Sequence, residues 1–507
     1  MADTKREIER KFEFTTSKAA RRGVPDLTGT AAIAAVADQG TVDLDAVYYD
    51  TPDQRLAAAG LTLRRRTGGA DAGWHLKLPV SPGVRDEVTA PLSDTVPRAL
   101  AVLVRSRVRD LALEPQVRLV SSRRLSHLLD AEGALLAELS TDAVRAERDE
   151  AAAAWTEVEV ELADGVDPAL LDAVEKKFRK AGLKVSDAPS KLARALTETG
   201  TEPPARPGPA AAEGTAGALV LSYLGEQRDA LVALDPAVRR GLPDSVHQMR
   251  IACRRMRSAF KTYRKVLDRA ATDPLGEELR WLAAELGLDR DQEVLFDRIQ
   301  THVTELPRTL VVGPVRGRLR TWNNARRSAT RRHALAALDA KRYAALLDAL
   351  DALLADPPLL PGAAEPAARA LPKAVRKDYE RLATRVAGAL DLDPGEPRDL
   401  ALHEARKAAK RARYAAEAAT PELGKPAKQL AKAMKSVQGL LGDHQDSVVA
   451  REALRGIAAQ AAGAGESAFT WGVLYAREEA LAAQRERELP DVWGQAAYPS
   501  FRAEPGS

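Results

Sequence analysis

The spacing of apolar residues divides the chain into two parts with different periodicity. In residues 1–200, apolar and charged residues alternate in short segments such as REIERKFEF, LTLRRRT, GWHLKLP, ALLAELSTDAV and WTEVEVEL. A period of two is typical of β-strands that have one apolar face. Two helices are also predicted here, near residues 28–38 and 167–181. The pattern therefore predicts a strand-rich domain over residues 1–200.

Beyond residue 217 the periodicity becomes that of α-helices, and Ala, Leu and Arg dominate. Pro-containing breaks between the predicted helices fall near residues 242–244, 307–314, 357–366 and 393–397. Residues 201–217 are rich in Pro, Gly and Ala and have no periodicity, which predicts a linker. The fold class expected is α+β, with an all-α domain over residues 218–507.

The helical part contains an internal repeat. HQMRIACRRMRSAF begins at His247, and HEARKAAKRARYAAE begins at His403. A second pair follows, LGLDRDQEV from Leu286 and LGDHQDSVV from Leu441. The repeat indicates a helical domain built from two related halves.

Composition limits the classes of protein to which the chain can belong. The single cysteine, Cys253, excludes an internal disulfide and a cysteine-rich zinc site. No apolar run reaches the roughly 18 residues of a membrane span, and the N-terminus lacks the apolar stretch of a signal peptide. We therefore expect a cytoplasmic protein that does not bind membranes. Its oligomeric state does not follow from the sequence.

Net charge is +4 but is unevenly distributed along the chain. Residues 1–200 hold 29 Lys and Arg against 32 Asp and Glu, whereas residues 201–507 hold 47 against 40. The helical part is therefore the better candidate for binding a polyanion.

Charged side chains of the N-terminal part are sorted by strand and share strand faces by parity. The acidic set begins with Glu7 and Glu9 and continues with Asp142, Glu157 and Glu159. The basic set comprises Lys11, Arg64, Arg66 and Lys77. A solvated sheet face would also alternate, and this alternative stays open. If the charged faces line a closed barrel instead, a divalent cation would compensate the carboxylates and phosphate oxygens would compensate the basic groups.

These segments, in this order, resemble the CYTH superfamily, also called triphosphate tunnel metalloenzymes. The matching stretches within residues 5–198 are EIERK, YYDTPDQRLAAAGLTLRRR, WHLKLP, VRDEVTAPL, SSRRLSHLL, ELSTDAV, EVEVEL and SKLARAL. The resemblance implies an antiparallel eight-stranded β-tunnel. It also implies hydrolysis or cyclisation of triphosphate-bearing substrates with Mg²⁺ or Mn²⁺.

The resemblance assigns roles to individual residues. Carboxylates on the metal side would be Glu7, Glu9, Glu157, Glu159 and Asp142, with Glu87 at a further acidic position. Groups holding the triphosphate would be Lys11, Arg64, Arg66, Lys77, Arg123 and Lys191. Glu7, Glu9 and Lys11 would be central to in-line attack of water on a terminal phosphorus. Arg124 adjoins Arg123, so the register at this position stays open.

Basic residues of the repeat helices recur at spacings of three and four, which places them on one helix face. The first helix offers His247, Arg250, Arg254, Arg257 and Lys261. The second offers His403, Arg406, Lys410 and Arg413, and a third stripe offers Lys428, Lys432 and Lys435. A solvated helix usually mixes charge signs, so these faces indicate an anionic partner, although basic helices that are merely solvated stay an alternative.

Nucleic acid is disfavoured as that partner, because aromatic residues make up only 4% of the chain and are not interleaved with the Lys and Arg residues, as platforms for stacking nucleobases would require. The H-x-x-R helices, the two LG segments and LDAKRYAALLDAL resemble the CHAD (conserved histidine α-helical) domain over about residues 218–500. The resemblance implies two related four-helix bundles around a basic cavity that binds inorganic polyphosphate. Asp291 and Asp446 match its acidic positions.

Together these observations predict a metal-dependent inorganic triphosphatase that hydrolyses tripolyphosphate and carries a polyphosphate-binding domain. A thiamine triphosphatase and an adenylate cyclase of the same superfamily stay open, as does a non-catalytic polyphosphate-binding protein. The parity of Trp74 places its ring outside the tunnel, which disfavours stacking on a heterocycle.

Overall fold

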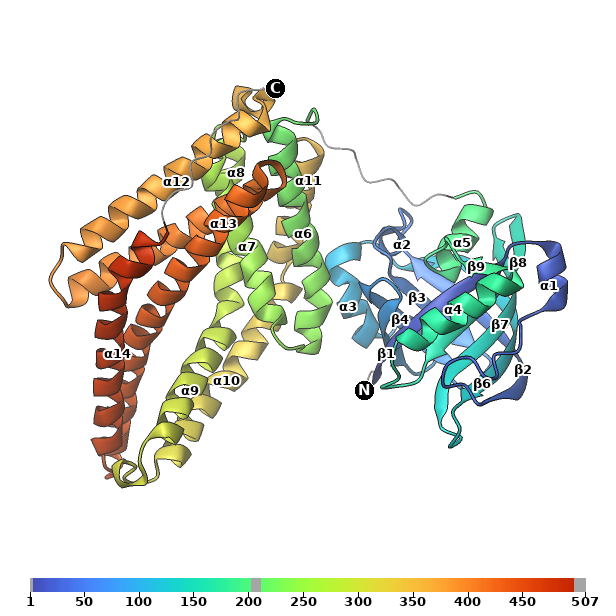
Figure 1. Ribbon diagram of the computed structural model, residues 1–507, viewed down its shortest axis with the longest axis horizontal. Helices are drawn as coiled ribbons and strands as arrows, with labels where there is room; N and C mark the ends of the chain where they lie inside the picture. The colour runs from blue at the N-terminus through green and yellow to red at the C-terminus, as the bar shows by residue number, and fades with distance from the viewer. Residues whose placement is uncertain (1–2, 202–210, 497–507) are drawn as a thin grey trace. The chain divides into compact units, whose positions relative to one another are not determined.

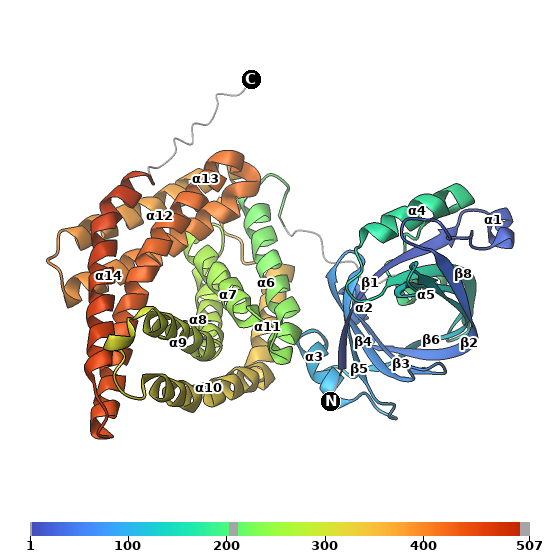
Figure 2. The same ribbon diagram turned by 60° about the horizontal axis from the view of Figure 1, so that its bottom comes forward.

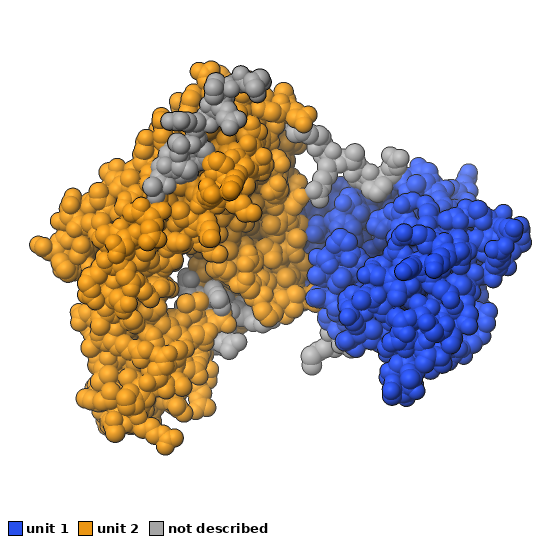
Figure 3. Space-filling view, in the orientation of Figure 1, with its two compact units in different colours: residues 1–206 blue, residues 207–507 orange. Residues whose placement is uncertain are grey.

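The computed structural model describes residues 3–201 and 211–496, with the backbone alone described at residues 3, 288–291 and 325–331. The chain divides into two compact units, residues 1–206 and residues 207–507 (Figure 3). Part of the predicted linker, residues 202–210, lies outside the described residues. Each unit is described by itself below.

The N-terminal unit is a closed antiparallel barrel. Its strands are β1 (Asp3–Phe14), β2 (Ala35–Asp50), β3 (Thr62–Thr67), β4 (Gly73–Ser81), β5 (Val84–Ala90), β6 (Glu114–Leu129), β7 (Leu135–Arg148), β8 (Ala151–Leu162) and β9 (Leu183–Val185). Its helices are α1 (Ser17–Arg22), α2 (Arg55–Ala58), α3 (Arg98–Val108), α4 (Ala169–Ala181) and α5 (Lys191–Glu198). The order β5-β4-β3-β2-β6-β7-β8-β1 closes on itself because β1 also pairs with β5. The predicted α+β class and eight-stranded tunnel are confirmed.

The predicted helix near residues 28–38 is wrong, whereas the one near residues 167–181 corresponds to α4. Residues 28–34 form turns, and β2 begins at Ala35. The Ala-rich sequence favours a helix locally, but Ile33 is buried in the core and the Ala34 amide donates to the Leu129 carbonyl of β6. Pairing with β6 therefore overrides local propensity.

Helices cover the outer, apolar face of the barrel (Figures 1 and 2). Phe12 of β1 packs edge-on against Phe178 of α4, with the ring centroids 4.8 Å apart. On the other side, Trp74 and Leu76 of β4 are buried in one cluster with Leu100 of α3. Apolar side chains of β1 and β4 thus face outward, whereas the charged residues Glu7, Glu9, Lys11 and Lys77 of the same strands face the lumen.

Helix α5 closes one end of the barrel. Its residues Leu192, Ala195 and Leu196 are buried with Leu119 of β6 and Trp155 of β8. This end of the lumen is therefore filled by apolar side chains, and the remaining length contains the charged ones.

The C-terminal unit is helical throughout its regular structure. Its helices are α6 (Ala216–Arg240), α7 (Ser245–Thr262), α8 (Arg269–Glu285), α9 (Gly287–Glu305), α10 (Val315–Asp339), α11 (Lys341–Ala355), α12 (Ala367–Leu390), α13 (Glu396–Gly463) and α14 (Phe469–Gly494), with 3₁₀ turns η1 (Arg308–Leu310) and η2 (Pro361–Ala364). The predicted Pro-containing breaks fall between these helices. Within α13, Gly424 has φ 58°, which breaks the helix into two segments.

The two sequence repeats place their basic segments on α7 and on the first segment of α13. The largest apolar cluster draws residues from both halves, including Met249 and Met256 of α7 and Leu402 of α13. Cys253 is buried in the same cluster, as an apolar core position would require. None of the helices in the described parts of the chain is long and apolar enough to cross a membrane.

The contact between Phe12 and α4 anchors the strand that carries Glu7, Glu9 and Lys11. Because Phe12 is fully buried, replacing it with Ala should lower the free energy of unfolding of the N-terminal unit by about 3–5 kcal/mol. Hydrogen–deuterium exchange should show faster exchange in β1 and β8. Peptides of α6–α14 serve as the internal control, and equal acceleration there would contradict a local role for Phe12.

Candidate active site and basic cavities

The open part of the barrel lumen is a cavity of about 500 Å³ lined almost entirely by charged and polar side chains. Its lining includes all eight strands of the closed barrel and the first residue of α5. Antiparallel register brings opposite charges together across neighbouring strands: Lys11 faces Glu159, Lys77 faces Glu87 and Arg123 faces Asp142. Acidic and basic side chains that the sequence places on different strands therefore lie opposite one another in the closed barrel.

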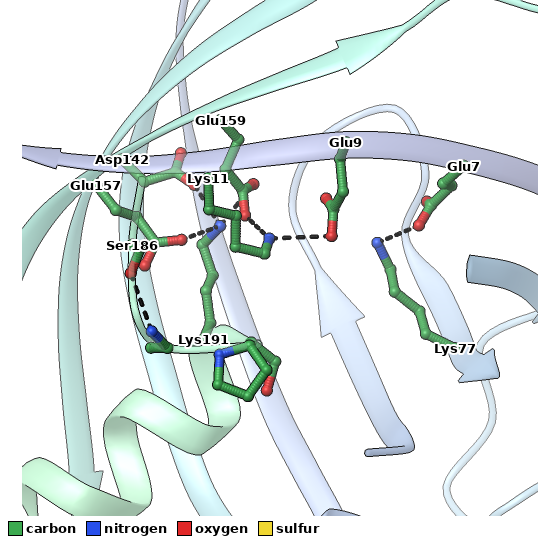
Figure 4. A network of polar contacts seen from close by, with 12 residues as sticks. Glu7, Glu9, Lys11, Lys77, Asp142, Glu157, Glu159, Ser186 and Lys191 are labelled. Carbon is green, nitrogen blue, oxygen red and sulfur yellow. Dashed lines mark hydrogen bonds and ion pairs between the residues drawn. The ribbon is translucent and has the colours of Figure 1, made fainter. Parts of the chain in front are cut away.

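The motif on β1 points into the lumen as its parity predicts (Figure 4). The Lys77 Nζ lies 2.6 Å from Glu7 Oε2, and the Lys11 Nζ lies 3.2 Å from Glu9 Oε1. Lys11 also forms an ion pair with Glu159. Both glutamates are buried.

A second group of carboxylates surrounds the Lys191 ammonium. Its Nζ lies 2.9 Å from Asp142, 2.7 Å from Glu157 and 2.6 Å from Glu159 (Figure 4). Lys191 is the first residue of α5, so the helix that closes the barrel also inserts a cation into the lumen. The five predicted metal-side carboxylates thus lie in two groups, one around Lys191 and one formed by Glu7 and Glu9.

Arginines line the wall opposite these groups. Arg123 donates from Nε and Nη2 to both oxygens of Asp142, at 2.8 and 2.7 Å. Arg124 instead pairs with Asp38 and is exposed, which settles the register in favour of Arg123 in the lumen. Arg64 and Arg66 line the cavity, whereas Arg65 donates to the Ser93 carbonyl outside it.

Burial and neighbouring charges shift the pKa values of these groups. Burial, reinforced by the carboxylates of Glu87 and Glu161, raises the pKa of Glu7 to about 7. Burial would also raise the pKa of Glu9, but Lys11 and Lys77 overcome it and lower that pKa to about 2. Burial, together with the guanidiniums of Arg64 and Arg123, lowers the pKa of Arg66 to about 9. Neighbouring acids raise the pKa of Arg123 and of Arg64 instead, so among these three arginines the charge of Arg66 is the least compensated.

The acidic residues fit a divalent cation. Ligand oxygens of Asp142, Glu157 and Glu159 all lie within 4.8 Å of one another, and the three side chains are buried. Glu7 Oε2 and Glu157 Oε1 are buried and each faces one ammonium nitrogen, at 2.6 and 2.7 Å. Hard carboxylate oxygens are the ligands that Mg²⁺ and Mn²⁺ prefer.

Sequence reasoning gave no binding role to several residues of this cavity. Tyr48, His75 and Arg85 line it together with Asp71. The parity of His75 with Lys77 was the available signal for the histidine. The parity of Arg85 with Glu87 in β5 was the signal for the arginine, whereas Asp71 lies in a loop, where no alternation exists to predict direction.

In the helical unit, the two repeat segments meet around a cavity of about 510 Å³. Among the described residues, its basic lining comprises His247, Arg250, Arg254, Arg298, His403, Arg406, Lys410 and Arg413, and its acidic lining is Asp446. The predicted His, Arg and Lys positions of both repeats are therefore brought together, apart from Arg257 and Lys261. The side chain of Asp291, the other predicted acidic position, lies outside the described residues.

Arg257 and Lys261 line a second basic cavity of about 610 Å³. Its basic residues are Arg254, Arg257, Lys261, Arg280, Arg381, Arg385, Lys407, Lys410 and Arg411, and its one acidic residue is Glu404. Arg254, Lys410 and Tyr414 line both cavities, so the two adjoin at these side chains.

One glycine of the LG segments makes room for an arginine of the facing helix. A Cβ at Gly287 would lie 2.8 Å from Arg250 Nη2, whereas one at Gly442 would lie at an ordinary contact distance, 3.6 Å from Arg406 Nε. Close packing against the H-x-x-R helix therefore gives a reason for glycine at position 287 and none at position 442.

Positive charge in the first cavity is strongly concentrated. Burial and the guanidiniums of Arg406, Arg254 and Arg250 lower the pKa of Lys410 to about 7. Arg254 Nε is a buried donor that makes no hydrogen bond to any described residue. By contrast, the predicted stripe of Lys428, Lys432 and Lys435 is exposed on α13 and lines neither cavity.

Comparison with known proteins agrees with both units. The CYTH domain family matches residues 5–196, and the CHAD domain family matches residues 222–455. An uncharacterized protein of Mycobacterium tuberculosis (strain CDC 1551 / Oshkosh), MT2285, is 39% identical over 508 residues, covering 95% of this chain and 94% of that protein.

Solved structures resemble each unit separately. The CHAD domain from the plant Ricinus communis is 26% identical with a TM-score of 0.45, and the match covers 59% of this chain and 99% of that one. A putative adenylate cyclase from Bacillus halodurans is 20% identical with a TM-score of 0.26, and the match covers 38% of this chain and 97% of that one. The two family matches and the full-length relative show that the chain belongs to the family of proteins in which a CYTH domain is followed by a CHAD domain.

Proposed function

We propose that the N-terminal unit is a metal-dependent triphosphatase that hydrolyses inorganic tripolyphosphate. The observation that carries the proposal is that buried carboxylates that fit a divalent cation lie in one barrel with a wall of arginines, of which Arg66 is incompletely compensated. A linear phosphate chain offers the negative charge that this wall lacks.

Glu7, Glu9, Glu157, Glu159 and Asp142 are the residues that would hold Mg²⁺ or Mn²⁺. When bound, such a cation neutralises charge that develops on the phosphoryl oxygens and lowers the pKa of a bound water. Lys11, Lys77, Lys191, Arg64, Arg66 and Arg123 would bind and orient the phosphates for in-line attack. Helix α5 excludes water from one end of the lumen.

The positions of the aromatic rings in the lumen favour an inorganic triphosphate over nucleotide or thiamine substrates, whose heterocycles would stack on a free ring. The aromatic rings among the lumen-lining residues are Tyr48 and His75. The Tyr48 hydroxyl accepts from Arg64 Nη1 at 3.4 Å, and His75 lies between Glu87 and a loop carbonyl, so neither is placed as a free stacking platform. Trp74 is buried outside the lumen, as its parity predicts.

The replacement of Glu7 and Glu9 together by Gln tests the triphosphatase. Phosphate release from tripolyphosphate with Mg²⁺ or Mn²⁺ should fall by about 100-fold or more, because two metal-side charges are lost. Thiamine triphosphate and ATP should be poorer substrates, with cyclic AMP measured in parallel. Glu150→Gln, in the exposed turn at the far end of the β7–β8 hairpin, is the matched control. Absence of metal-dependent release by the unaltered chain would refute the enzyme.

We further propose that the helical unit binds inorganic polyphosphate across its two adjoining cavities. The support is the ratio of charges: among the described residues, the linings contain the basic side chains of both repeats, with Asp446 and Glu404 as their acids. Arg254 and Lys410 lie where the cavities adjoin, so one continuous phosphate chain could contact them from either side.

Removing three positive charges from the cavities and removing three from the lysine stripe of α13 should lower polyphosphate affinity by different amounts. Replacing Arg254, Arg406 and Lys410 with Gln should weaken binding of long-chain polyphosphate by more than about 100-fold, because buried charged contacts are lost. Replacing Lys428, Lys432 and Lys435 with Gln should cost much less, since exposed charges are screened by salt. Calorimetry on the full chain measures both. An equal or larger loss from the stripe would place the binding site outside the cavities.

Polyphosphate affinity should also depend on pH through Lys410. A bound anion raises its pKa from about 7, so binding takes up a proton. Affinity should therefore be full below pH 7 and decline by up to about tenfold per unit as pH rises above it. Lys410→Arg keeps its charge and corrects for titration of the polyphosphate itself. The same decline in both proteins would contradict a role for Lys410.

A further inference from the structure

The loop between β3 and β4, residues 68–72, supplies a carboxylate to the wall of the tunnel. Gly69, Ala70 and Asp71 belong to the cavity lining. The Asp71 carboxylate forms an ion pair with Arg66 Nη2. The Arg66 side chain is only 5% exposed, whereas that of Asp71 is 61% exposed. The pair therefore joins a cation inside the lumen to an acid at its solvent-facing mouth.

The mouth of the tunnel lies at this end. Besides Asp71, the exposed charged residues of the lining are Lys5, with 52% of its side chain exposed, and Glu138, with 46%. Lys191, beneath α5 at the other end, is 10% exposed. Asp71 therefore lies among the exposed charged residues at the mouth.

The backbone of the loop is held in place, so the position of Asp71 is built into the fold. Gly68 has φ 81°, and a Cβ there would lie 2.2 Å from the Asp43 carbonyl oxygen of β2. Only glycine permits this approach. His75 Nε2 lies 2.9 Å from the Asp71 carbonyl oxygen and fixes the loop from inside the barrel.

Asp71 occupies a donor that a phosphate would need. Arg66 Nη2 is engaged by the carboxylate, while its buried Nε makes no hydrogen bond to a described residue. A phosphate at Arg66 offers more acceptor oxygens and more charge than the carboxylate. Because two anions at one guanidinium repel each other, the carboxylate competes with a phosphate for Arg66.

We propose that Asp71 is a specificity-determining residue that holds Arg66 in the free tunnel and is displaced by the phosphate nearest the mouth. An anion has to bind Arg66 and the deeper cations together to offset this displacement, which favours a triphosphate over a single phosphate. The inference rests on the proposed triphosphate chemistry and adds to it that the Asp71 carboxylate competes with the substrate phosphate for Arg66.

Asp71→Asn removes the charge of the competitor and keeps its size. Calorimetry with tripolyphosphate in EDTA, without divalent metal, should show binding about two- to fivefold tighter, the range expected for a partly exposed ion pair. In the metal-loaded reaction, KM should fall by a similar factor while kcat is kept. Glu150→Gln removes one charge from the same unit at the far end of the β7–β8 hairpin and should change neither quantity.

A double-mutant cycle isolates the pair. Arg66→Gln should weaken tripolyphosphate binding, and adding Asp71→Asn to it should give no further gain. The inference is overturned if Asp71→Asn binds no tighter than the unaltered chain, or if its gain persists in the Arg66→Gln background. If the unaltered chain neither binds nor hydrolyses tripolyphosphate, both this inference and the proposed triphosphatase fail.

Discussion

The organisation of the N-terminal unit depends on the compensation of charges inside a closed barrel. Removing an unpaired carboxylate from water costs several kcal/mol, so each one in the lumen needs a cation close by. Register supplies these cations, since Lys77 reaches Glu7 and Arg123 reaches Asp142. Lys191 belongs instead to α5, so the helix that closes the barrel end also provides the ammonium group that neutralises three carboxylates. The outer helices α3 and α4 can then pack against the apolar outer faces of the strands, because the charges of the lumen are compensated inside the barrel.

The helical unit leaves the opposite imbalance. Arginine and lysine side chains of two repeats converge on adjoining cavities with few acids to meet them, and burial lowers the pKa of Lys410 to about 7. On the proposed functions, the two units would use one ligand chemistry differently: the tunnel would combine phosphate groups with a metal, whereas the cavities would bind phosphate by cations alone.

Sequence patterns anticipated the lumen better than its surroundings. Parity placed Glu7, Glu9 and Lys11 inside and Trp74 outside, because alternation in a strand is a local property. The register at Arg123 required the pairing of β6 with β7, and the helix expected near residues 28–38 was replaced by turns and the start of β2. In the helical unit, spacing placed Arg250 through Lys261 on one face, but Tyr414 and the residues around it divide that face between two cavities.

The sequence by itself determined the alternation of charged and apolar faces, the division into a strand-rich and a helical part, and the repeat of basic helices. These are properties of neighbouring residues, which a period of two or 3.6 records directly. The tertiary structure alone decided which cation meets which carboxylate, that Lys191 enters the lumen from a helix, and that Asp71 reaches Arg66 from a loop. Those contacts depend on barrel closure and on glycine-dependent loop geometry, and they join side chains whose own segments contain no periodic signal for one another.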